Sequence, residues 1–86
     1  MEPHSLRFKS SVGKDLRRLP AKSRSRCLAR VAELRLAPRP AGARLVAGGE
    51  RTYRLRVGVH RVIYQVDDTA RMVTVVYIRH RKDAYR

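Results

Sequence analysis

Three arginines in the second half of the chain have the type and spacing needed to bind phosphate. Arg54, Arg56 and Arg61 belong to two runs, 51–57 and 60–66, in which Val, Tyr and Arg alternate with a period of two. A strand directs alternate residues to one face, and like charges gathered there repel unless an anion lies between them. Because guanidinium groups bind phosphate oxygens well, the pattern predicts an anion-binding face, with a solvated polar face as the alternative.

The two residues between these runs determine how the strands pair. Gly58-Val59 fits a type II′ turn, with glycine where a positive φ is needed. The turn predicts the pairs Val57–His60, Arg56–Arg61, Leu55–Val62, Arg54–Ile63 and Tyr53–Tyr64. The three arginines then share a face with Ile63, and we expect Val76 and Ile78 there too. A guanidinium cluster beside an apolar floor suits a groove for phosphate and bases, or for a partner segment.

The C-terminal stretch adds further basic and proton-transferring groups. It contains Arg79, His80, Arg81, Lys82 and Tyr85. A reference pKa of about 6.5 suits His80 to proton transfer near neutral pH. Alternation leaves open whether His80 or Arg81 faces the three arginines, and basic tails are often only solvated segments. We interpret Tyr53, Tyr64 and Tyr77 mainly as core packing, and His4 and His60 as incidental.

The elements that must position these groups form one small α+β domain, residues 1–86. Alternation predicts strands at 5–9, 51–57, 60–66 and 72–78 with a short edge segment at 45–46, and apolar spacing predicts helices from Ser10 or Ser11 to Leu19 and from Ala21 to Ala37. The last strand is apolar on both sides, so we expect it to be central or covered on both faces. The expected architecture is a helical hairpin packed on one face of a small twisted antiparallel sheet.

The composition indicates a polyanionic partner. The 86 residues include 21 Lys and Arg against 7 Asp and Glu, a net charge of +14. A lone Cys27 excludes an intramolecular disulfide, and no Cys/His cluster has metal-ligand spacing, so we expect neither metal nor cofactor. No apolar run reaches the roughly 20 residues of a membrane span, and 1–9 lacks a signal-peptide stretch, so we expect a cytoplasmic protein.

Two motifs together resemble a known family. The run YRLRVGVHRVIYQVDD at 53–68 and the segment HRKDAYR at 80–86 resemble the RelE/ParE toxins of bacterial toxin–antitoxin modules. The order of a strand, two helices and a meander is also the family's order, and the resemblance covers nearly the whole chain. Resemblance to RelE implies a ribosome-dependent mRNA endonuclease without a cofactor, neutralised by a cognate acidic, RelB-like antitoxin.

The same resemblance implies roles for individual residues. The RelE-type site falls on Arg54, Arg56, Arg61, Arg81 and Tyr85, with Arg79, Lys82 and His80 beside them. Arg54 and Arg56 would clamp phosphate, because arginine does not give up a proton at working pH. Tyr85 would be the general base, with His80 as the other candidate, and Arg81 would neutralise the leaving oxygen. We expect Arg61 to stabilise the charged transition state, and Arg79 and Lys82 to bind RNA.

Two other functions stay open from the sequence. A ParE-like toxin would inhibit DNA gyrase with the same fold, yet it would not need Arg61, Arg81 and Tyr85 together. A non-catalytic RNA-binding protein would explain the charge of +14, but not the convergence of clustered arginines with a terminal tyrosine. The combination of residues favours the nuclease.

Overall fold

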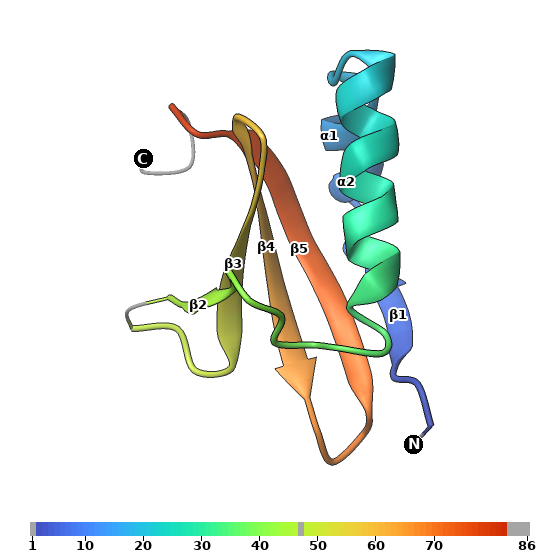
Figure 1. The fold of residues 1–86 in the computed structure, drawn as a ribbon, viewed down its shortest axis with the longest axis vertical. Coiled ribbons are helices and arrows are strands. Elements are labelled where there is room, and N and C mark those ends of the chain that lie inside the picture. Colours follow the sequence, from blue (N-terminus) through green and yellow to red (C-terminus); the bar gives the residue numbers. More distant parts are fainter. Residues whose placement is uncertain (1, 47, 83–86) are drawn as a thin grey trace.

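The computed structural model describes residues 2–46 and 48–82. The elements are β1 (Ser5–Phe8), α1 (Val12–Arg17), α2 (Ala21–Glu33), β2 (Arg44–Leu45), β3 (Thr52–Val57), β4 (His60–Asp67) and β5 (Met72–His80). The strands form one sheet of order β1-β5-β4-β3-β2, and both helices lie on the same side of it (Figure 1). This arrangement confirms the expected α+β fold.

The sheet is mixed, which corrects the expectation of a wholly antiparallel one. β1 runs parallel to β5, from Ser5 opposite Met72 to Phe8 opposite Val75, whereas the other neighbouring strands are antiparallel. Two helices separate β1 from the meander, and a helical connection of this length can return the chain in the parallel direction. β5 therefore lies between β1 and β4, as its apolar character on both sides predicts.

The helices are shorter than predicted because other contacts take over at their ends. The Arg24 guanidinium donates hydrogen bonds to the carbonyls of Leu16 (3.1 Å) and Leu19 (3.2 Å), and so caps the end of α1. At the end of α2 the Leu34 N–H bonds the Val31 carbonyl at 3.0 Å, one residue closer along the chain than in an α-helix. This tightened turn ends α2 at Glu33, ahead of the two prolines that follow.

A β-bulge divides β5 into two halves. The β3–β4 register matches the predicted pairs, and Gly58 has the expected positive φ of 60°. Between β4 and β5, however, Ile63 faces Tyr77 while Tyr64 faces Val75, so Val76 is an extra residue. The alternation of side chains reverses there. Ile78, 2% exposed, points into the core, and Tyr77 takes the place that we expected Val76 and Ile78 to hold beside the arginines.

The hydrophobic core lies between the helices and one face of the sheet. Its buried members are Val12, Leu19, Cys27, Val31 and Leu34 from the helical half and Leu55, Val57, Val62, Tyr64, Val66, Val73, Val75 and Ile78 from the strands. Burial raises the pKa of the Cys27 thiol, which suits a packing role. The sheet face away from the helices is called the open face below. Within the described ranges, no helix is both long and apolar enough to cross a membrane.

Candidate anion-binding site on the open face

A row of three arginines crosses the open face, one from each of three neighbouring strands. Arg56 of β3 lies opposite Arg61 of β4, which lies opposite Arg79 of β5. Residues paired in this way have Cβ atoms only about 4.5–5.5 Å apart, so three positive charges adjoin. Arg61 is 5% exposed, whereas Arg56 and Arg79 are exposed. Like charges placed side by side repel, and an anion bound across the row would be held by guanidinium groups from three strands.

A second row of cross-strand neighbours forms the partly apolar surface next to the arginine row. It consists of Arg54 on β3, Ile63 on β4 and Tyr77 on β5. Ile63 is 7% exposed and Tyr77 is half-buried. The guanidinium carbon of Arg79 lies 4.3 Å from the centre of the Tyr77 ring, a cation–π contact. The prediction that Tyr77 packs in the core is wrong, because period-two alternation gave no sign of the bulge.

The residues that follow β5 extend the arginine row. The Arg81 backbone N–H donates to the Val59 carbonyl at 2.8 Å, which continues the β4–β5 pairing one step beyond His80. Alternation therefore assigns Arg81 to the same side of the sheet as Arg79. Lys82 is exposed in the turn after the strand. Tyr85, the predicted general base, lies outside the described residues.

His80 lies on the helix side of the sheet, away from the arginine row. Its ring meets the ring of His60 edge-on, with centroids 5.6 Å apart, and its Nδ1 accepts a hydrogen bond from the Lys82 backbone N–H at 3.2 Å. His60 is 7% exposed, and burial, together with the neighbouring His80, lowers the pKa of His60. The pair closes one end of the core, so His60 is part of the packing and not incidental.

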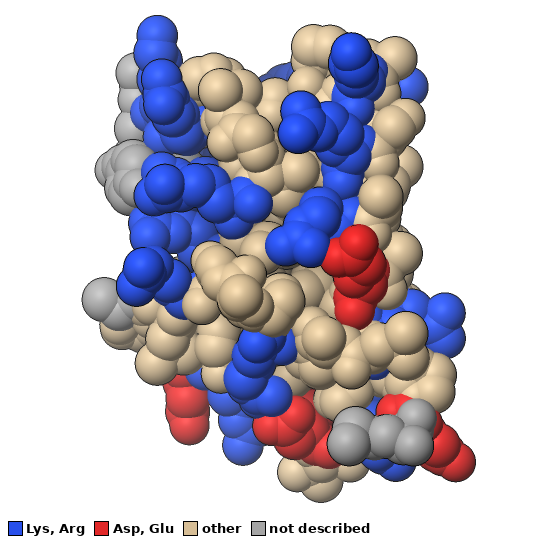
Figure 2. All heavy atoms as spheres, in the orientation of Figure 1, with Lys and Arg blue, Asp and Glu red and all other residues tan. Residues whose placement is uncertain are grey.

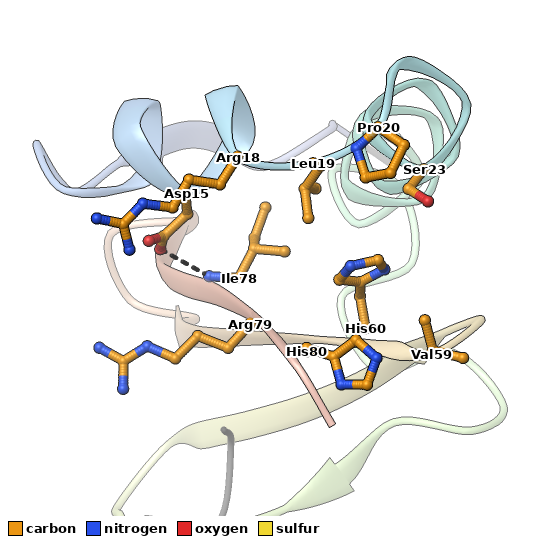
Figure 3. Close-up of a pocket in the computed structure, with 10 residues that line it drawn as sticks. All are labelled: Asp15, Arg18, Leu19, Pro20, Ser23, Val59, His60, Ile78, Arg79 and His80. Atoms are coloured by element: carbon orange, nitrogen blue, oxygen red, sulfur yellow. Dashed lines mark hydrogen bonds between the residues drawn. The ribbon is translucent and has the colours of Figure 1, made fainter. Parts of the chain in front are cut away.

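A cleft of about 680 Å³ opens beside this histidine pair (Figure 3). It lies between the α1–α2 connection and the ends of β4 and β5, and is lined by Asp15, Arg18, Leu19, Pro20, Ser23, Val59, His60, Ile78, Arg79 and His80. A carboxylate oxygen of Asp15 accepts a hydrogen bond from the Ile78 backbone N–H at 3.0 Å. Because β1 pairs with β5 only as far as Val75, this bond satisfies an edge amide that β1 does not reach.

Charge is distributed unevenly over the surface. On the face drawn in Figure 2, Lys and Arg form two bands over the upper part of the molecule, while the visible Asp and Glu lie from about mid-height downward, together with further Lys and Arg. A hollow of about 330 Å³ between α2 and the β3–β4 turn is lined by Arg26, Arg30, Arg56 and three small or apolar residues. Among the residues that the structure describes, no three His, Cys, Asp or Glu side chains could hold a metal ion. The site offers an anion mainly guanidinium N–H donors.

Comparisons with known proteins agree with this architecture. The family model "ParE toxin of type II toxin-antitoxin system, parDE" matches residues 6–85. The toxin RelG of Mycobacterium tuberculosis is 33% identical over 89 residues, 98% of each chain. RelE in the RelE–RelB complex of Pyrococcus horikoshii OT3 is 25% identical with a TM-score of 0.80, covering 95% of this chain and 99% of the other. A chain of the intact E. coli RelBE toxin–antitoxin complex is 26% identical with a TM-score of 0.76, covering 90% and 95%.

The fold and the extent of these matches define the class of protein. The chain belongs to the RelE/ParE superfamily of toxins from type II toxin–antitoxin systems. It is a RelE-like toxin component of such a module. The resemblance that the two sequence motifs carry is therefore confirmed.

Proposed function

We propose that this toxin is a metal-independent endoribonuclease that cuts mRNA on the ribosome in the bacterial cytoplasm. The observation that supports the proposal most directly is the arginine row, in which Arg56, Arg61 and Arg79 adjoin across three strands. Three adjoining guanidinium groups can stabilise a phosphodiester that becomes more negative during cleavage. The net charge of +14 also favours association with RNA.

The proposed reaction is attack of a ribose 2′-hydroxyl on the adjacent phosphodiester. The 2′-oxygen–phosphorus bond forms, the bond from phosphorus to the 5′-oxygen breaks, and the products carry a 2′,3′-cyclic phosphate and a 5′-hydroxyl. Arg61 stabilises the charge on the phosphorane, because it is the most buried arginine of the row. Arg79 and Arg81 act on the leaving 5′-oxygen, while Arg54, Arg56 and Lys82 bind phosphates of the same strand.

Two proton transfers accompany these bond changes. The 2′-hydroxyl gives its proton to a general base, and the 5′-oxygen takes one from solvent water as it leaves, its negative charge being held until then by Arg79 and Arg81. We propose Tyr85 as the base, as the resemblance to RelE implies; a tyrosine can act in this way near neutral pH only if guanidinium groups lower its pKa. His80 has its ring on the helix side and its Nδ1 engaged by the Lys82 N–H. We therefore propose that His80 orders the turn carrying Arg81 and Lys82 and takes no part in proton transfer.

Dependence on the ribosome follows from the weakness of these groups as catalysts in isolation. Arginine cannot act as a base at neutral pH, and a tyrosine is a poor one. Contacts with ribosomal RNA would hold the message in the bent geometry needed for in-line attack, an effect that can contribute several orders of magnitude. We expect the purified protein to cut naked RNA poorly. Efficient cutting of free RNA without ribosomes would refute this part of the proposal.

A cognate acidic antitoxin is the proposed inhibitor. RelE of P. horikoshii and RelE of E. coli are seen in complexes with RelB. On this chain the open face combines Ile63 and Tyr77 with the arginine row, a surface suited to an amphipathic helix with acidic margins. Its carboxylates would pair with the guanidinium groups, and occupation of this face would block RNA. Association should be fast and sensitive to salt, while the apolar contacts keep dissociation slow.

Inhibition of DNA gyrase is the second candidate function, because the family model that matches is the ParE toxin. One experiment separates the candidates: induce the chain in bacteria, follow mRNA integrity by primer extension, and monitor the DNA-damage response. Cleaved transcripts without early DNA damage support the nuclease. DNA damage with intact transcripts would support gyrase inhibition, and unaffected growth would contradict both.

A further inference from the structure

We infer that Tyr77 is a positioning residue whose ring holds the Arg79 guanidinium over the open face. This inference rests on the proposed nuclease function and adds to it a residue that has no part in the reaction described above. The guanidinium carbon of Arg79 lies 4.3 Å from the centre of the Tyr77 ring. Stacking of this kind is a favourable way to orient a guanidinium while its N–H groups remain free to bind phosphate.

The β-bulge at Val76 is what brings the two side chains together with the rest of the site. Because Ile63 faces Tyr77 and Arg61 faces Arg79, the second half of β5 directs both residues to the open face. Uninterrupted pairing would have sent Tyr77 toward the helices and the core. The bulge therefore places an aromatic ring beside the arginine row, where a purely structural tyrosine has no reason to be.

Arg79 needs such an anchor more than Arg61 does. Arg61 is 5% exposed and is confined by its surroundings, whereas Arg79 is exposed. β1 pairs with β5 only up to Val75, so within residues 2–46 and 48–82 no strand adjoins the outer side of β5 at Arg79. Repulsion from Arg61 pushes the guanidinium of Arg79 toward that uncovered edge.

An alternative place for the Arg79 side chain lies over that edge. Arg79 also lines the helix-side cleft, and Figure 3 shows it in the same cleft as Asp15, whose carboxylate would attract a guanidinium released from the ring. Tyr77 therefore shifts the guanidinium toward the face where RNA is proposed to bind. The ring supplies this effect, and its hydroxyl group does not.

The test uses the full chain on programmed ribosomes, with kcat and KM of mRNA cleavage measured for wild type and four variants. We expect Tyr77→Phe to stay within about twofold of wild type and Tyr77→Leu to lose about three- to tenfold in kcat with little change in KM, the scale of one cation–π contact. Arg79→Ala should lose more. Adding Tyr77→Leu to Arg79→Ala should cost nothing further, because the ring acts through Arg79.

A second measurement reads the contact without any cleavage. In NMR spectra, ring-current shifts of the Arg79 side-chain protons should be present in wild type and Tyr77→Phe and absent in Tyr77→Leu, with thermal melting confirming that each variant is folded. Unshifted Arg79 protons in wild type, or equal losses from Tyr77→Leu with and without Arg79, would overturn the inference. A wild type that shows the shifts but does not cut mRNA would instead refute the proposed nuclease function.

Discussion

Arginine is used in opposite ways at the two ends of the sheet. Near the β4–β5 turn, Arg39 donates two hydrogen bonds to the Asp68 carboxylate, at 2.6 and 3.3 Å, and a third to the Tyr53 hydroxyl at 2.8 Å. Near the β3–β4 turn, Arg56, Arg61 and Arg79 adjoin as like charges. The first group, called the latch here, has its donors matched to acceptors. In the arginine row, by contrast, like charges lie next to one another.

The contrast separates residues that stabilise the fold from residues that we propose bind a ligand. The latch joins the connector after α2 to the turn before β5, segments that lie 29 residues apart in sequence. Beside it, the buried Tyr64 hydroxyl donates to the Pro38 carbonyl at 2.6 Å, which holds the same connector. The arginine row instead places like charges side by side on neighbouring strands, an arrangement that favours a bound anion. Variants at the two ends should therefore affect different measurements.

The largest expected effect is on activity, at the arginine row. Arg61→Ala and Arg81→Ala should each reduce cleavage about a hundredfold or more and abolish growth arrest, because each removes a preorganised donor to the reacting phosphate. Thermal melting should show that both variants still fold, so that the loss of activity reports on the reaction. Arg17→Ala, which removes one exposed guanidinium from α1, is the matched control and should remain toxic. If both the Arg61→Ala and the Arg81→Ala variants remained fully toxic, these two residues could not be the donors that cleavage requires.

A smaller effect, on stability alone, is expected next to the latch. Tyr64→Phe leaves the Pro38 carbonyl without the hydroxyl donor seen at 2.6 Å and should lower the free energy of unfolding by about 1 kcal/mol. Ribosome-dependent cleavage should be unchanged at temperatures where the variant is folded. Tyr77→Phe, which removes a hydroxyl from the open face, serves as the comparison and should be close to neutral in urea unfolding. If Tyr64→Phe altered activity and not stability, the division between the two ends would be wrong.

These two ends also differ in how well the sequence predicts them. The β3–β4 register follows from Gly58-Val59, because a two-residue turn fixes which residues of the two strands pair with each other. Arg56 opposite Arg61 was therefore predictable. The Val76 bulge was not, because residues 75–78 around it include no charged side chain that would mark a change of face. Because of the bulge, the side chains of Tyr77 and Arg79, and not that of His80, lie on the open face.

The latch could not be predicted for a different reason. Arg39 and Asp68 are brought together by the path of the connector and not by any strand register. Asp68 fits a turn residue from its local sequence, and Arg39 fits a solvated cation between two prolines. Only long-range contacts distinguish these residues from the many other arginines of this basic chain. Local periodicity thus predicts the strand-borne part of the site, while contacts between loops need the folded structure.

The smallest expected effect is the pH dependence of the latch. The hydrogen bond from Arg39 holds the pKa of the Asp68 carboxyl below its ordinary value, and His4, with Nε2 3.5 Å from a carboxylate oxygen, adds to this. A carboxyl whose pKa is lower in the folded state contributes stability above its unfolded pKa of about 4, and loses it as the pH falls through the folded value.

Asp68→Asn tests this directly. The difference in unfolding free energy between wild type and Asp68→Asn should be constant from pH 7 to about 5 and should shrink below about pH 4, where the wild-type carboxyl becomes protonated in both states. Because Asp68 is exposed, added salt should reduce the difference at neutral pH. Glu50→Gln, at another exposed carboxylate, should give no comparable trend. A difference for Asp68→Asn that stayed constant down to pH 2 would mean that the shape of the side chain, and not its charge, stabilises this end of the sheet.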